Sequence, residues 1–335
     1  MSAMLQSILS AQFGFAVLRV MTPLLFPAVG VAISGLAGSV NIALEGIMLC
    51  SACAGVLVSA FTQSLWLALA AGLATGIGLA ALLGFFHLRL KADIILAAIA
   101  MNMMAGGLTI FVLFLATGEK GSSSSLTSLV FPLVHLPLVR RIPVLGEILS
   151  GQNVLVYGAF LAVFLYWLIV FKTPLGLRIR AVGQNPDAAQ SVGINVNRTR
   201  MWALLLSGFF GALGGLYLAM GYVSWFARDM TAGRGWIAIA AASLGNNMPL
   251  GTFLSSLLFG VVNSLAIYLA PLAVPSEFIQ MIPYVATALA LTASSIQAAR
   301  RRRKLCRSSS TAIPAMTTWW RFCWPAPPRS WRCSG

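Results

Sequence analysis

Long apolar runs, bounded by charged or turn-forming residues, recur along almost the whole chain. A helix needs about 20 mostly apolar residues to cross the hydrocarbon core of a membrane. Apolar windows predict about nine spans, near residues 13–34, 40–61, 64–86, 93–116, 154–171, 201–220, 236–245, 251–271 and 278–298. The window 236–245 is too short to cross alone. It is either extended from 221–235 or forms a half-helix of the kind that transporters place around substrate sites.

Basic residues predict which ends of the spans face the cytoplasm, because Lys and Arg in short loops favour that side. Three such clusters lie within residues 89–91, 172–200 and 300–304. Alternating spans then place 117–153 and 271–277 outside and 245–251 inside. With an odd number of spans and an inside C-terminus, the N-terminus is expected outside.

Composition agrees with a membrane protein. Of the 335 residues, 59% are hydrophobic and 9% are charged, whereas a soluble domain is about 25% charged. The mean hydropathy is +0.89. We therefore predict an all-α fold, a polytopic integral membrane helix bundle of about 8–10 transmembrane helices.

The net charge of +15 arises largely from one tail. Residues 300–335 carry nine of the 22 basic side chains and no acid, together with four Trp and three Cys, without helical periodicity. We predict a transmembrane domain over 1–299 and, over 300–335, a basic tail that is disordered or aberrant. The remaining cations lie in short loops, so nucleic acid is not an expected partner.

Common enzyme motifs are missing from the sequence. No lysine follows a glycine, so there is no P-loop, and the two histidines, His87 and His135, are too far apart for a zincin helix. Cys50 and Cys53 form a C-x-x-C pattern inside an apolar run, where packing is the favoured interpretation. We expect no catalytic residue, no metal site and no cofactor on this chain.

Polar residues inside the spans are functional hypotheses by default, because burying them in a membrane is costly. Glu45 either follows a helix start capped by Ser39 or Asn41, or forms part of a gate or translocation path. Arg19 either pairs with Glu45 or reaches the headgroups. Four amides either bind a polar solute or join neighbouring helices: Asn102, Asn246, Asn247 and Asn263.

Glycines recur at helical spacing in two of the predicted spans. Gly72 and Gly76 form one pair, and Gly208, Gly211 and Gly215 form a longer stripe. Small residues let membrane helices approach closely. We interpret both sets as helix-packing positions.

The inside loop 172–200 carries strong helix-start signals. Asn185 is a good N-cap, Pro186 suits the first helical position and Asp187 complements the helix dipole. A short helix is predicted from 186 to about 192, ending at Gly193. It either offers a surface to a partner or merely connects two spans.

Several of these motifs together resemble a known family. They are Gly38 to Gly46 (Gly-Ser-Val-Asn-Ile-Ala-Leu-Glu-Gly), Lys91 to Ile95, Thr173 to Gly183, Pro186 to Ala189 with Gly193-Ile194, and Gly233 to Ala240. Over residues 12–298 the chain resembles the transmembrane permease subunits of ATP-binding-cassette (ABC) importers, in the branch for branched-chain amino acids, simple sugars and nucleosides. Within that branch it is most similar to nucleoside permeases.

The resemblance implies roles for particular residues. The inside loop 172–200 would be the coupling loop, whose helix docks on an ATPase through Asn185, Pro186, Asp187, Ala188, Ala189 and Gly193. The stretch Gly233 to Ala240, with Asn246 and Asn247 beyond it, is similar to the family's permeation-path region. Together with the polar residues considered above, the candidates for the translocation path are Asn41, Glu45, Asn102, Asn246 and Asn247. One departure is that residues 35–38 are uncharged, where the family usually has charges, which puts a charge-mediated contact there in doubt.

The resemblance also implies partners and a location in the bacterial inner membrane. The partners would be an ATPase that holds ATP and Mg, a second permease (a paralogue or a second copy), an extracytoplasmic solute-binding lipoprotein and membrane lipid. Nucleosides are the expected solute, with ribose-like sugars or branched-chain amino acids as alternatives.

Two other classes of membrane protein are alternatives to an importer subunit. A stand-alone ion-coupled carrier is expected to carry ionisable groups at mid-bilayer, where only Glu45 and Arg19 qualify. A structural or assembly subunit would not need the capped inside helix.

Overall fold

The computed structural model describes residues 11–119, 121–126, 128–134 and 150–269, and beyond them only residues 285, 288 and 292. The chain divides into two compact units, residues 1–287 and 288–335, and the first is described below. The predicted last span, 278–298, and the predicted tail lie outside the described residues, apart from the isolated positions just named.

The described part of the first unit is helical with one small sheet. The helices are α2 (Ala11–Leu36), α3 (Leu44–Thr62), α4 (Leu65–Gly84) with the π-helix η1 (Phe85–Arg89), α5 (Ile94–Thr117), α7 (Val154–Lys172), α8 (Pro174–Gln184), α9 (Pro186–Ser191), α10 (Val196–Tyr217) with the π-helix η3 (Leu218–Val223), α11 (Arg234–Leu244) and α12 (Pro249–Leu269). Strands β1 (Leu133–Val134) and β2 (Gln152–Asn153) pair antiparallel. Seven of the described helices are long and apolar enough to cross a membrane. The all-α prediction is confirmed.

Polar side chains fix where several helices begin. The Asp93 Oδ1 accepts hydrogen bonds from the backbone N–H groups of Ile95 and Leu96, at 2.8 and 3.1 Å. These bonds satisfy N–H groups that have no partner within the first turn of α5. Asn153 caps α7 in the same way, and Gly118, at φ +74°, ends α5 in the left-handed conformation.

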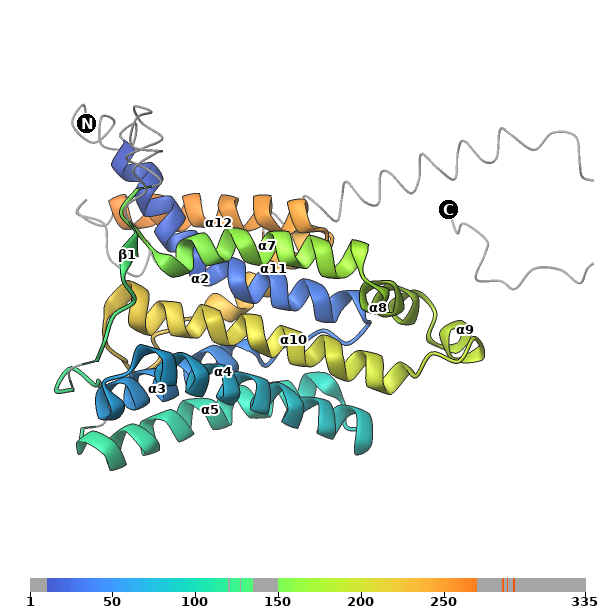
Figure 1. Ribbon diagram of the computed structural model, residues 1–335, viewed down its shortest axis with the longest axis horizontal. Coiled ribbons are helices and arrows are strands. Elements are labelled where there is room, and N and C mark those ends of the chain that lie inside the picture. The colour runs from blue at the N-terminus through green and yellow to red at the C-terminus, as the bar shows by residue number, and fades with distance from the viewer. Residues whose placement is uncertain are drawn as a thin grey trace, which may run out of the picture. The chain divides into compact units, whose positions relative to one another are not determined.

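Helix α2 lies at the centre of the bundle, beside α10 (Figure 1). In its most apolar window, 89% of residues are buried, against 22% for α5. Helices α7, α11 and α12 pack against α2, while α3 packs against α4, α5 and α10. Thus α5 is peripheral and α2 is the core element.

The bundle has two distinct ends, which we name from the predicted orientation (Figure 1). At the outer end, Ser123 N–H bonds to the carbonyl oxygen of Phe226, and Leu129 N–H bonds to the Ser59 hydroxyl. At the inner end, α8 and α9 project away from the side of β1. The described parts of 117–153 and 172–200 therefore lie at opposite ends, as the alternating spans require.

The glycine stripes lie where α4, α3 and α10 meet. A Cβ added at Gly76 would lie 2.5 Å from the Cβ of Ala212 and 3.0 Å from the carbonyl oxygen of Gly208. Gly72 faces Leu216, Gly211 faces Leu44 and Gly215 faces the backbone of Met48. Larger side chains would push these helices apart.

Two predicted boundaries are decided by the structure. The window 40–61 becomes helical only at Leu44, and Ala43 occupies the N-cap position without a side-chain cap. The expectation that Ser39 or Asn41 caps this helix is therefore wrong. The window 236–245 is an independent helix, α11, of 11 residues. It is a half-helix, because η3 ends at Val223 and does not extend it.

Candidate functional site

The non-helical segment 37–43 lies between the inner end of α2 and the start of α3, and its polar groups are bonded. The Asn41 side chain is completely buried. Its Nδ2 donates to the Ser207 Oγ on α10 (3.1 Å), and its Oδ1 accepts from the backbone N–H of Ala43 (3.0 Å). Its backbone N–H donates to the Ser34 Oγ on α2. Asn41 therefore ties this segment to two helices.

Asn102 on α5 bonds both to this segment and to the first turn of α3. Its Oδ1 accepts from the N–H of Gly46 (2.8 Å), and its Nδ2 donates to the carbonyl oxygen of Ile42 (3.0 Å). The amide thus joins α5 to α3 and to the segment 37–43, and its place in a translocation path stays a prediction.

Glu45, in the first turn of α3, bonds to the first residues of α11. Its Oε1 accepts from the N–H of Gly233 (2.8 Å), and its Oε2 accepts from the N–H of Gly235 (2.7 Å). The amino end of a helix carries partial positive charge, which favours a carboxylate there. We call this pair of hydrogen bonds the Glu45 clasp.

The clasp lies deep in the bundle. Asn102 follows the first residue of α5 by eight positions, about 12 Å along a helix. Gly235 precedes the last residue of α11 by nine positions, about 14 Å. Glu45 thus lies more than two helical turns inside the inner ends of α5 and α11.

The remaining polar candidates lie apart from the clasp. Asn246 and Asn247 follow α11 at the inner end, at φ +53° and +51°. The Tyr166 hydroxyl on α7 donates to the carbonyl oxygen of Asn247. Arg19 Nη2 donates to the carbonyl oxygen of Tyr222 (2.8 Å), and its guanidinium lies over the Tyr222 ring. The structure thus shows Arg19 bonded to η3.

Sequence reasoning missed the partners that complete these bonds, above all Ser207 and Tyr166. Ser207 adjoins Gly208 in the glycine stripe of α10. That position predicts a contact between helices, but it does not predict a buried hydrogen bond. Tyr166 lies in an unbroken apolar window, where nothing in the sequence sets it apart.

At the inner end, successive caps shape α8, α9 and the start of α10. The Asn185 Oδ1 accepts from the N–H of Ala188, and the Asn195 Oδ1 accepts from the N–H of Arg198, both at 3.0 Å. The predicted short helix is confirmed as α9, and Gly193 follows it at φ +83°. Asp187 and Ala188 are exposed, whereas Ala189 faces inward.

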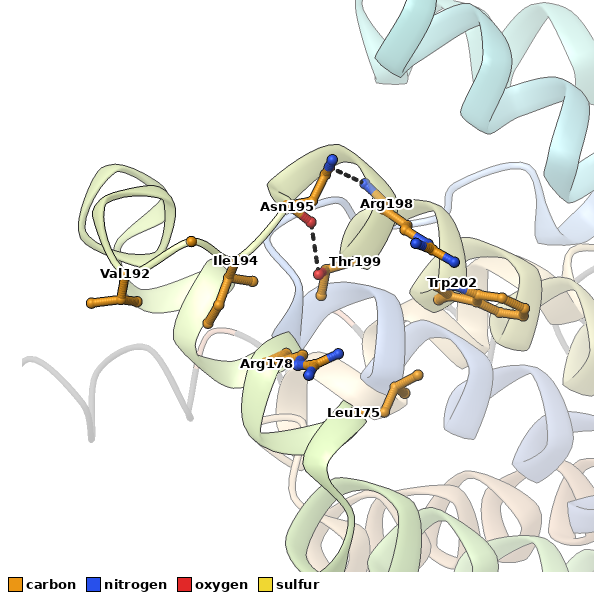
Figure 2. A pocket seen from close by; sticks show the side chains of 9 residues that line it. Leu175, Arg178, Val192, Ile194, Asn195, Arg198, Thr199 and Trp202 are labelled. Atoms are coloured by element: carbon orange, nitrogen blue, oxygen red, sulfur yellow. Dashed lines mark hydrogen bonds between the residues drawn. The ribbon is translucent and has the colours of Figure 1, made fainter.

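A cavity of about 500 Å³ opens between α8, the loop after α9 and α10 (Figure 2). Its lining residues are Leu175, Arg178, Val192, Gly193, Ile194, Asn195, Arg198, Thr199 and Trp202. Arg178 and Arg198 reach it from different helices, and Trp202 and Leu175 supply apolar surface. The lining holds two cations and no acid, so an acidic or anionic partner suits it.

The inner end also contacts the segment that leads to the clasp. A Cβ on Gly183 of α8 would overlap the carbonyl oxygen of Leu36, so these backbones approach as closely as only glycine allows. Arg200 Nε, on α10, bonds to the carbonyl oxygen of Ala37 (3.4 Å). Among the described residues, no group of three or more His, Cys, Asp or Glu is arranged to hold a metal ion.

Comparison with known proteins decides the family. The family described as "Branched-chain amino acid transport system / permease component" matches residues 14–291. The chain belongs to this permease family. It is therefore a transport subunit with no catalytic role of its own, and the family implies an ATPase and a second permease as partners.

Individual relatives agree with the family. The chain is 36% identical to the nucleoside ABC transporter permease protein NupC of Lactococcus lactis subsp. cremoris, over 81% of this chain and 88% of NupC. It is 37% identical to the guanosine ABC transporter permease protein NupQ of Bacillus subtilis, with the same coverage. The solved structure of PsaBC from Streptococcus pneumoniae in complex with Fab shares the fold, with TM-score 0.50 and 13% identity over 86% of this chain and 94% of that chain.

Proposed function

We propose that this permease translocates nucleosides across the bacterial inner membrane as part of an ATP-driven importer. The observation that carries the proposal is the similarity to NupC and NupQ, which runs over four fifths of the chain. Both relatives are named for nucleoside transport. Ribose-like sugars and branched-chain amino acids are the alternatives that the test must separate.

The capped helix α9 supports docking of a separate ATPase chain, which would hold ATP and Mg. Its exposed residues Asp187 and Ala188 stand at the tip of the inner end, and the adjoining arginine-lined cavity offers a complementary surface for an acidic segment. A displacement of α8 would also displace the segment 37–43, because Gly183 of α8 packs against the backbone of Leu36. The complete importer would add a second permease, a paralogue or a second copy, and an extracytoplasmic solute-binding lipoprotein, within the lipid of the membrane.

Uptake of labelled adenosine tests the solute class. A strain that lacks this gene, and has no other nucleoside carrier, should lose uptake. In the parent strain, unlabelled nucleosides should compete, whereas ribose and leucine should not. Unchanged adenosine uptake in the deletion strain would contradict nucleoside transport, and competition by ribose or leucine alone would favour the alternatives.

Arginine substitutions at α9 test docking. Gly193→Arg places a large cation at a left-handed position, and Ala188→Arg places one on the exposed face of α9. Each should lower the amount of co-purified ATPase more than tenfold. Ser125→Arg adds the same charge to an exposed position at the outer end and should leave the association unchanged. Full retention of the ATPase by both α9 variants would show that α9 is not the docking helix.

A further inference from the structure

The half-helix α11 is held at both ends. The Glu45 clasp holds its amino end to α3, and the carbonyl oxygen of Asn247, just past its carboxyl end, accepts a hydrogen bond from Tyr166 on α7. A helix of 11 residues is about 16 Å long, so α11 covers only half of a hydrocarbon core. Its position therefore depends on these two attachments and on its packing against α2, α3 and α12.

The clasp requires a backbone approach that only glycine allows. A Cβ on Gly235 would lie 2.7 Å from both the backbone nitrogen and the Oε2 of Glu45. Gly233 adopts φ +76°, a left-handed conformation that glycine takes without strain, and its N–H donates to the Glu45 Oε1. Both glycines and the carboxylate are thus parts of one close contact.

The same junction connects to the inner end by two routes. One route runs from Glu45 back through the segment 37–43 to Leu36, where Gly183 of α8 packs. The other runs from α11 through Asn247 and Tyr166 along α7, which is followed directly by α8 after Thr173. Helix α8 therefore lies at the junction of both routes.

Two buried hydroxyls lie close to the clasp in sequence, one on each of the segments it joins. Ser39, in the segment 37–43, and Thr231, two residues before Gly233, are both buried, and their hydroxyls have no hydrogen-bond partner. Unbonded buried polar groups are uncommon and costly. Both lie on stretches of chain that lead directly to the clasped residues, Ser39 toward Glu45 and Thr231 toward Gly233.

We propose that Glu45 is a positioning residue for transport: its carboxylate holds the amino end of α11 to the start of α3 and carries movements of α8 to the half-helix. The inference rests on the proposed function for the solute that is counted and for the ATPase that would move α8. Among the described residues, Glu45 is the one carboxylate inside a membrane-spanning helix, so no second acid there could replace it.

The test uses the complete importer reconstituted in vesicles, with adenosine uptake and ATP hydrolysis measured together. Glu45→Gln keeps the shape but removes the charge and one of the two acceptors, and it should lower adenosine uptake per ATP at least tenfold while ATP hydrolysis persists. Glu45→Asp keeps the charge and should restore part of the ratio. An unchanged ratio in Glu45→Gln would overturn the proposal.

A distance measurement tests the clasp without reference to the solute. Spin labels at Ala54→Cys on α3 and Ser243→Cys on α11, in a chain without its native cysteines, should give one narrow distance in native Glu45 and a broad distribution in Glu45→Gln. Equal distributions would overturn the clasp, even if uptake is lost. A native importer that hydrolyses ATP without moving nucleosides would contradict the proposed function alone, because the distance comparison still applies.

Glycine variants approach the same contact from the α11 side. Gly235→Ala should broaden the distance distribution and lower uptake per ATP, because its Cβ meets the Glu45 carboxylate. Gly106→Ala, on α5, meets nothing within 4 Å and should leave both values unchanged. A Gly235→Ala importer that behaves like the Gly106→Ala importer would count against the clasp.

Discussion

Asn41 and Asn102 each use both ends of the side-chain amide, one as donor and one as acceptor. An amide inside an apolar bundle stabilises it only when both ends are bonded, since an unbonded polar group there costs several kcal/mol in hydrocarbon. The two amides therefore bond to a non-helical segment, whose backbone has no regular helix to satisfy it.

Ser207→Ala should destabilise the protein, because it leaves the Asn41 Nδ2 without its partner. The expected loss is about 1–2 kcal/mol in the free energy of unfolding. Thermal unfolding in detergent measures it, with Ser243→Ala as the control, since the Ser243 hydroxyl is exposed and bonds only within its own helix. If Ser207→Ala and Ser243→Ala unfold alike, the Asn41 bond contributes little.

At the scale of elements, α4 and α10 pack through glycine. Two glycines on α4 allow the contribution of this close packing to stability to be measured. Gly76 faces Ala212 and Gly208, whereas Gly78, two residues further on, has nothing within 4 Å of an added Cβ. The two positions share a helix and a residue type but differ in what they face.

Gly76→Val should lower the stability of the bundle by about 1–3 kcal/mol or more, the usual range for an overpacked core. Gly78→Val carries the same β-branched side chain into open space and should cost much less. The measurement is the unfolding temperature of both variants in the same detergent. Similar losses at both positions would mean that helix propensity, and not close packing, sets the cost.

Hydropathy predicted most elements because a membrane span needs little more than length and apolar side chains. The windows 93–116 and 154–171 differ from α5 and α7 by one residue at most. The window 40–61 was wrong at its start, since the chain is not helical before Leu44 although the residues around Asn41 are apolar. The clasp could not be predicted, because Glu45 and Gly233 are 188 positions apart and one sequence contains no pairing information.

At the scale of the whole molecule, the two ends differ in chemistry as well as in shape. At the inner end of the described chain, Arg178 and Arg198 line a cavity beside the capped helix α9. The outer end includes the serines of residues 122–125 and the short strand β1. Orientation can therefore be tested with one residue at each end.

Single cysteines should react from opposite sides of the membrane. With the native cysteines replaced, Ser125→Cys should react with a membrane-impermeant maleimide in intact spheroplasts, and Gln190→Cys only after the membrane is opened. Ser125 and Gln190 are both exposed in the structure. A difference in labelling would therefore report the side of the membrane and not burial of the cysteine. The reverse labelling pattern would invert the predicted topology.

Helix α9 is complete without any partner, since Asn185 and Pro186 begin it and Gly193 allows the chain to turn away. Ordering a flexible segment on binding costs about 1–2 kcal/mol of backbone entropy per residue. A protein that docks on α9 meets a segment that has already lost this freedom, so more of the contact energy remains as affinity. Because α9 is already ordered, a displacement of α9 by a bound partner would be passed on to α8 and would not be lost in local unfolding of α9.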